Sequence, residues 1–170
     1  MQAFTQETTK KEVSEIIEAE LINKGFTIQN KDLSRPWGGF FVIDEDQSDL
    51  FITTFFQHLN PLDFKGFSKL SPKILLVQPD KRLSWQYHHR RAEIWKIIGG
   101  SAGVIVSDTD EQTDMKTLNK EDVIELRQGE RHRLVGLGQW GVVAEIWKHT
   151  HSENPSNEED IVRVEDDFGR

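Results

Sequence analysis

The chain has 170 residues, a formal net charge of −8 and no cysteine. This length fits one domain with an adequate core, and the lack of cysteine excludes disulfides and thiolate catalysis. The negative charge argues against nucleic acid as a partner, although a small phosphorylated ligand needs only a few local cations. The N-terminus is polar and no apolar run has the length of a transmembrane helix, so we expect a cytoplasmic protein without membrane contact.

The first predicted element is an amphipathic helix. Thr9 and Glu12 can form a capping box, apolar residues follow at helical spacing from Val13 to Leu21, and Gly25 supplies a stop. We expect the helix to pack on the domain or on a partner subunit. Its apolar stripe, together with the exposed edges of the strands predicted below, leads us to expect a homodimer.

A turn, a strand and a short helix come next. The turn at residues 35–39 leads into a strand over residues 40–43. Arg35 and Trp37 in this turn fit a rigid corner and a role at the rim of a pocket equally well. Residues 50–55 predict a short helix.

From residue 73 onward, short apolar strands recur with turn residues between them. They are expected over residues 74–77, 83–88, 93–98, 103–106, 123–126 and 141–147, and a last strand is expected over residues 161–164. Regular short strands of this kind imply an antiparallel sandwich or barrel. The acidic stretch 108–114 lacks a clear calcium-loop pattern, and we expect a solvated hairpin tip there.

The stretch 83–95 carries the densest set of chemically useful side chains, which are Gln86, His88, His89 and Glu93. Alternate side chains on a strand share a face, so Gln86 and His88 point one way and His89 the other. We expect a turn at Arg90 and Arg91. A second strand after that turn would form a hairpin and return Glu93 beside Gln86 and His88.

His132 offers a fourth group farther along the chain. Two imidazoles, one carboxylate and one amide oxygen make a suitable shell for a divalent metal. The predicted ligands are Gln86, His88, Glu93 and His132. Zinc is the expected metal, with manganese, cobalt, nickel and iron as alternatives. His89 could replace His88, and any one histidine taken alone could simply be hydrogen-bonded.

The spacing Gln-x-His-x4-Glu, followed by Gly-x-x-His, resembles the paired motifs of cupins. Residues 83–95 and 160–170 more closely resemble the isomerase domain of type II phosphomannose isomerases, as do the shorter stretches 35–38 and 132–134. With the strand pattern, this implies an all-β double-stranded β-helix (cupin, jelly-roll barrel) with an N-terminal helix and a short second helix. We expect one domain over residues 1–170, with an extension over 1–68 and a metal-binding barrel over 69–170.

The resemblance also implies a function, that of a mannose-6-phosphate isomerase. Such a metal-dependent aldose–ketose isomerase would interconvert mannose 6-phosphate and fructose 6-phosphate, and its metal would stabilise the enediol charge. Glu145 lies in a strand that is apolar on both faces, where a carboxylate needs a partner. It could form a salt bridge with an arginine, but the resembling family has the same residue, and we predict that Glu145 transfers the proton.

Cationic residues must hold the substrate phosphate, and the candidates are Lys73, Arg133, Arg163 and Arg170. We predict a catalytic role for Arg170, which could fold back over the pocket mouth. A surface salt bridge from Arg170 to Asp166 and Asp167 is the alternative.

Two other functional classes stay open on the sequence alone. A cupin could bind a sugar phosphate without turnover, and two histidines with one carboxylate could hold iron for oxygenase chemistry. Many proteins of the resembling family join this domain to a sugar-nucleotide pyrophosphorylase. The stretch before residue 73 is too short for one, so we expect the isomerase-like part alone.

Overall fold

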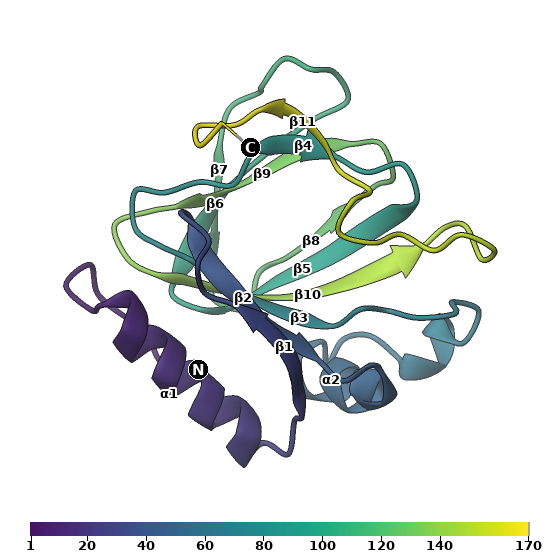
Figure 1. Ribbon diagram of the computed structural model, residues 1–170, viewed down its shortest axis with the longest axis horizontal. Helices are drawn as coiled ribbons and strands as arrows, with labels where there is room; N and C mark the ends of the chain where they lie inside the picture. The colour runs from purple at the N-terminus through teal and green to yellow at the C-terminus, as the bar shows by residue number, and fades with distance from the viewer. Residues whose placement is uncertain (170) are drawn as a thin grey trace.

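The computed structural model describes residues 1–169, and within them two antiparallel β-sheets face each other (Figure 1). The larger sheet has the strand order β1-β2-β3-β10-β5-β8, and the smaller has the order β11-β4-β9-β6-β7. The strands are β1 (Ile28–Asp32), β2 (Gly38–Ile43), β3 (Lys73–Val77), β4 (Trp85–Tyr87), β5 (Arg91–Gly99), β6 (Ser101–Ser107), β7 (Lys116–Asn119), β8 (Val123–Leu126), β9 (Arg131–Gly136), β10 (Gly141–His149) and β11 (Val162–Glu165). The predicted double-stranded β-helix is confirmed.

The predicted N-terminal helix is α1 (Lys10–Asn23), and it begins with the expected capping box. The Thr9 hydroxyl accepts from the Glu12 backbone N–H at 3.3 Å, and the Glu12 carboxylate accepts from the Thr9 N–H at 2.8 Å. Of the apolar stripe of α1, Val13, Ile17 and Leu21 are buried in a core of the same chain, whereas Ile16 is exposed. This packing removes one reason for the predicted homodimer, which stays a prediction that light scattering can test.

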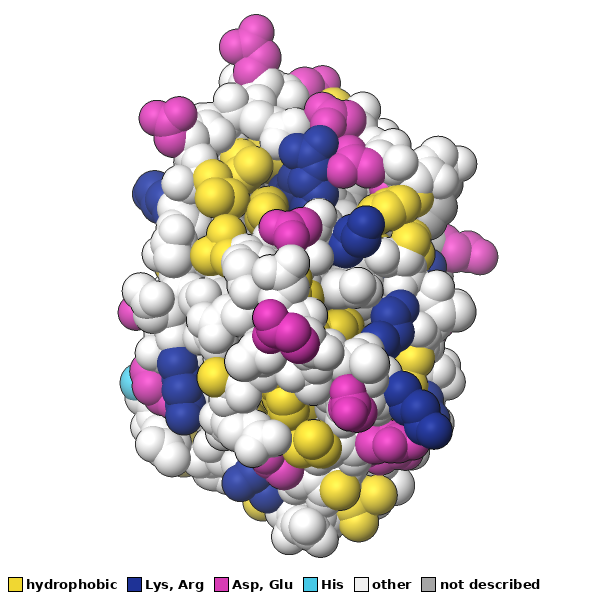
Figure 2. Space-filling view, turned by 90° about the vertical axis from the view of Figure 1, so that its left-hand side faces the viewer, with side chains coloured by type: hydrophobic (Ala, Val, Ile, Leu, Met, Phe, Trp, Pro, Cys, Tyr) yellow, Lys and Arg dark blue, Asp and Glu magenta, His cyan; other side chains and the backbone are white. Residues whose placement is uncertain are grey.

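A second helix, α2 (Ser48–Phe55), packs with α1 on the larger sheet. The short 3-10 helices η1 (Glu45–Gln47) and η2 (Pro61–Phe64) flank it. In Figure 1, α1 and α2 both lie below the larger sheet, on the side away from the smaller one. Among the described residues, no helix is long and apolar enough to cross a membrane. Acidic and basic side chains are interspersed over the face shown in Figure 2, rather than gathered by sign.

The strands of the larger sheet separate two cores. Ala144 and Ile146 of β10 belong to the core under the helices, whereas Val143 belongs to the core between the two sheets. Because successive side chains of a strand point to opposite faces, Glu145 shares the inner face with Val143. The same alternation on β5, where Ile94 faces the helices, places Glu93 inside the barrel.

The predicted hairpin around Arg90 and Arg91 is wrong. Strand β4 lies in the smaller sheet, and β5, which already includes Arg91, lies in the larger one. The chain crosses between the sheets after His88, and the backbone N–H groups of His89 and Arg90 each donate to the Asp160 carboxylate at 3.0 Å. Glu93 therefore meets His88 across the barrel interior and not along a hairpin.

Candidate metal centre and pocket

Three potential metal ligands come together from both sheets. His88 follows β4, His132 lies on β9 of the same sheet, and Glu93 reaches them from β5 of the facing sheet. One ligand atom from each residue can be chosen so that all lie within 4.8 Å of one another. Each of the three is only 2% exposed. The structure thus brings together three of the four predicted ligands in a place shielded from solvent.

Backbone carbonyls orient both imidazoles. His88 Nδ1 lies 2.6 Å from the Asp160 carbonyl oxygen, and His132 Nδ1 lies 3.0 Å from the Glu130 carbonyl oxygen. A carbonyl only accepts, so each Nδ1 carries the proton and each Nε2 keeps its lone pair. Both Nε2 atoms face Glu93, at 3.2 Å from Oε1 for His88 and 3.6 Å from Oε2 for His132.

The protonation states suit metal binding as well. Burial lowers the pKa of His88 to about 3, and burial also lowers the pKa of His132, so both imidazoles are neutral at pH 7. The buried Nε2 of His132 has no hydrogen-bond partner among residues 1–169. This lone pair is buried beside the Glu93 carboxylate and receives no hydrogen bond, which is unfavourable by the free energy of desolvation. A bound cation would remove that penalty, because it would accept the lone pair.

Arg91 contacts two members of this cluster, although its sequence context predicts a turn. Its Nε donates to Glu93 Oε1 at 2.7 Å, and its Nη2 lies 3.1 Å from His88 Nε2. Burial by itself raises the pKa of Glu93, but the charge and hydrogen bond of Arg91, together with the neighbouring His88 and His132, hold that pKa well below its usual range. Glu93 is therefore ionised, as a metal ligand must be.

The side chains of Gln86 and His89 point to opposite faces, as strand parity requires. Gln86 pairs with His132 across β4 and β9, lines the pocket and accepts from Ser84 Oγ at 2.5 Å. His89 is exposed, and its ring packs edge-on against Tyr87. The structure therefore places His88 in the cluster and His89 outside it, and Gln86 as a ligand stays a prediction.

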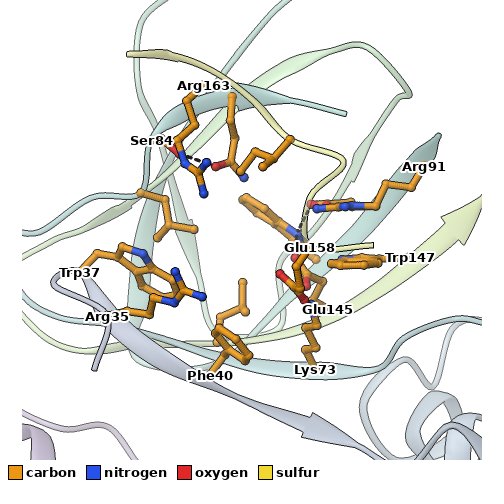
Figure 3. Close-up of a pocket in the computed structure, with 16 residues that line it drawn as sticks. Arg35, Trp37, Phe40, Lys73, Ser84, Arg91, Glu145, Trp147, Glu158 and Arg163 are labelled. Carbon is orange, nitrogen blue, oxygen red and sulfur yellow. Dashed lines mark hydrogen bonds and ion pairs between the residues drawn. The ribbon is translucent and has the colours of Figure 1, made fainter. Parts of the chain in front are cut away.

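The cluster borders a cavity between the sheets (Figure 3). The charged residues among those that line it are Arg35, Lys73, Arg91, Glu93, Glu145, Glu158 and Arg163. In Figure 3, Arg35 and Arg163 approach from one side, and Lys73, Arg91, Glu145 and Glu158 gather on the other. The candidate metal ligand Glu93 therefore shares the cavity with several cationic side chains. This arrangement suits an anionic ligand.

Glu145 lies on the inner face of β10 and is buried. Its Oε1 accepts from Trp95 Nε1 at 2.9 Å, and the same N–H lies 3.0 Å from Glu93 Oε2. Burial, followed by the negative charge of Glu93, raises the pKa of Glu145 to about 8. At pH 7 the residue is a neutral acid within the pocket, as a proton donor must be.

This raised pKa predicts a pH-dependent stability. The folded chain keeps a proton on Glu145 that the unfolded chain releases above the ordinary pKa of 4.5. The contribution of this group is therefore complete below pH 4.5 and is lost as the pH rises toward 8. We expect the free energy of unfolding of the wild type, minus that of Glu145→Gln, to fall over this interval in urea titrations with EDTA present. A difference that stays constant with pH would contradict the raised pKa.

The predicted phosphate ligands differ in whether they reach the cavity. Lys73 lines the cavity from β3, and Arg163 lines it from β11. Arg133 is fully buried elsewhere, where its Nε donates to the Leu83 carbonyl at 2.8 Å and its Nη1 contacts the Glu165 carboxylate at 3.1 Å. It neighbours His132 on a strand and so points to the other face, away from the pocket. Arg170 lies outside the described residues.

The family described as "Mannose-6-phosphate isomerase C-terminal" matches residues 59–166. The chain belongs to this family. The chain is similar to mannose-1-phosphate guanylyltransferase ManC of Salmonella typhimurium, with 27% identity over 83% of this chain and 23% of that protein. Alginate biosynthesis protein AlgA of Pseudomonas aeruginosa is 30% identical over 82% of this chain and 23% of that protein. The chain spans about a quarter of the length of these relatives.

Solved structures support the cupin fold of the family. Oxalate decarboxylase OxdC of Bacillus subtilis, solved as a mutant, aligns with a TM-score of 0.54 and 13% identity over 79% of this chain and 30% of that one. Capsular polysaccharide assembling protein CapF of Staphylococcus aureus aligns with a TM-score of 0.53 and 12% identity, over 83% and 34% of the two chains. At such identities the likeness concerns the fold alone.

These relatives correct the predicted activity. The expectation that the chain is an aldose–ketose isomerase is wrong, because these relatives are named as a mannose-1-phosphate guanylyltransferase and an alginate biosynthesis protein, and not as isomerases. The motifs that supported the expectation are those of a domain family. Such motifs identify the domain, whereas the reaction depends on the site and on the protein that contains it.

Proposed function

We propose that this domain binds one divalent metal and, beside it, a phosphorylated sugar of the mannose series. The observation that carries the proposal is the buried His88, Glu93 and His132 cluster, with its unpartnered His132 Nε2, on the edge of a cavity lined by cations. The names of the relatives support the mannose series, since they act on mannose 1-phosphate. A role within an enzyme of mannose phosphate metabolism follows from this proposal.

The proposed metal ligands are Gln86, His88, Glu93 and His132, with zinc as the first choice because two imidazoles and a carboxylate suit it. The His88 lone pair that now accepts from Arg91 is the one that a metal would use. A metal bound there would supply a Lewis acid to the oxygens of the sugar. Manganese, cobalt, nickel and iron are the alternatives.

The remaining pocket residues would hold and act on the sugar. Lys73 and Arg163 are proposed to bind the phosphate, with Arg35 at the rim, because all three line the cavity. Glu145, which is protonated at neutral pH, would donate a hydrogen bond or a proton to a sugar oxygen. Arg170 stays a predicted phosphate ligand, and the cytoplasmic location stays a prediction.

Calorimetric titration can test the proposal. Mannose 6-phosphate and mannose 1-phosphate, with neutral mannose as a control, would be titrated into metal-loaded protein and into EDTA-stripped protein. We expect at least one phosphorylated sugar to bind the loaded protein at least about tenfold more tightly than mannose, since a charge-assisted hydrogen bond contributes roughly 1.5–3 kcal/mol. Stripping the metal should weaken that binding. Equal binding of mannose, or no effect of stripping, would contradict the proposal.

A charge substitution at the pocket rim gives a second test. Arg163→Gln should weaken binding of the phosphorylated sugar at least about tenfold, because it removes a guanidinium from the cavity. Arg131→Gln is the matched control, since Arg131 pairs with Asp110 and packs over Tyr87 away from the lining residues. If the two variants bind equally well, Arg163 has no part in phosphate binding.

A further inference from the structure

The segment before β11 forms a turn with a fixed backbone. Ser156 and Asp160 are buried, and Ser156 Oγ donates to the Asp160 carboxylate at 2.6 Å. That carboxylate also accepts two backbone N–H groups from the crossing after β4. Glu158 projects from the middle of this turn, and its side chain is 61% exposed. Hydrogen bonds thus hold the backbone of this turn, whereas most of the Glu158 side chain is open to solvent.

Glu158 forms an ion pair with Lys73, whose side chain is only 5% exposed. The Lys73 ammonium lies 3.7 Å from the centre of the Trp147 ring and 5.4 Å from that of Phe40, so aromatic surface encloses it. A buried ammonium needs an anion close by. Glu158 is the anion that contacts it here, and Glu145 is the cross-strand neighbour of Lys73 on β10. Figure 3 shows Lys73, Glu145, Glu158 and Trp147 gathered on one side of the cavity.

We propose that Glu158 is an exchangeable counter-ion, which the phosphate group of a ligand displaces from Lys73. The inference rests on the proposed function of the pocket. Lys73 is enclosed and cannot follow a departing partner, whereas Glu158 reaches solvent by rotation of its own side chain. Two anions at one ammonium repel each other, so the ligand phosphate and the Glu158 carboxylate cannot share Lys73 at full strength.

The displaced carboxylate has a place to go. Lys73, Trp147 and Glu158 separate the main cavity from a neighbouring hollow, which is also lined by Lys69. If Glu158 rotated toward that hollow, its carboxylate would leave the buried Lys73 ammonium and approach the more accessible ammonium of Lys69. Glu158 then keeps the pocket electrically balanced between ligands, at the cost of weaker anion binding.

Inorganic phosphate is the probe for this inference. It would be titrated by calorimetry into wild type, Glu158→Gln and Glu159→Gln, all with the same metal content. Glu159 is the matched control because it is exposed on the same turn, and its substitution changes the net charge equally. We expect Glu158→Gln to bind phosphate at least about fivefold more tightly than wild type, and Glu159→Gln to stay within about twofold.

A double-mutant cycle with Lys73→Gln identifies the partner. The gain from Glu158→Gln should vanish when Lys73 is already replaced, because the carboxylate then has no ammonium to release. Circular dichroism checks that each variant is folded, and the comparison of the two glutamate variants stands without Lys73→Gln. Equal phosphate binding by Glu158→Gln and Glu159→Gln would overturn the inference while leaving the proposed function intact. If neither phosphate nor a phosphorylated sugar binds any variant, both are overturned.

Discussion

His88→Ala and His132→Ala should each lose most of the bound divalent metal and remain folded. Both imidazoles are held in the Nδ1–H tautomer by backbone carbonyls, so each Nε2 keeps a lone pair and lies within 3.6 Å of a Glu93 carboxylate oxygen. Loss of an outer hydrogen-bond partner typically weakens metal binding by about 10–100-fold, so loss of a ligand should cost at least about 100-fold. Elemental analysis of protein dialysed against trace metal measures the content, and circular dichroism checks the fold.

His89→Ala is the matched control for this experiment. His89 neighbours His88 but is exposed and packs on Tyr87, so its loss should leave the metal content unchanged. Full metal retention by the His88 variant, together with loss in the His89 variant, would move the ligand register by one residue. That result would contradict the parity observed at the end of β4.

Asp160→Ala should destabilise the fold strongly, although the residue lies outside the proposed metal ligands. Its carboxylate accepts from the His89 and Arg90 backbone N–H groups and from the Ser156 hydroxyl. Removing it leaves these donors without their acceptor at the point where the chain crosses between the sheets. A buried donor without an acceptor costs about 1–3 kcal/mol, so we expect the free energy of unfolding to fall by about 3 kcal/mol. Urea denaturation of metal-free protein measures it.

Glu159→Ala serves as the control, since it removes a carboxylate from the same turn at an exposed position. Substitutions at such surface positions usually change stability by less than about 0.5 kcal/mol. If Asp160→Ala loses less than about 1 kcal/mol, the carboxylate does not hold the crossing together. The crossing would then depend on the packing of its neighbours instead.

The sequence predicted much of the metal cluster because strand parity is a local property. Gln86 and His88 were placed on one face from their spacing alone, and His89 on the other, as the structure has them. The connection after β4 could not be predicted this way. Alternation says which way a side chain points but not which sheet the next strand joins, and a hairpin and a crossing between sheets have the same local pattern.

Three strands were missed for a physical reason. Strands β1 and β7 are mostly exposed and polar, so they lack the apolar alternation that marks a half-buried strand. Strand β9 is mostly buried, yet it contains Arg131, His132 and Arg133, which are typical of a loop. Arg133 is buried because it binds Glu165 and the Leu83 carbonyl, and these partners are far away in the sequence.

The role of Arg91 was missed for a similar reason. Its partners Ser156 and Asn157 lie more than 60 residues later in the chain, and no local pattern joins them. One signal was available, since an arginine two positions before Glu93 on a strand shares its face. The predicted activity was wrong for another reason. Motif spacing identified the family correctly, but it does not determine the reaction of the protein that contains the domain.

We propose that His88, Glu93 and His132 form a metal site at the pocket. Anomalous X-ray diffraction at the zinc edge, from crystals grown with zinc, tests it most directly. We expect one strong anomalous peak about 2.0–2.2 Å from both histidine Nε2 atoms and a Glu93 carboxylate oxygen. No peak at this cluster, or a strongest peak at the acidic stretch 108–114, would contradict the account.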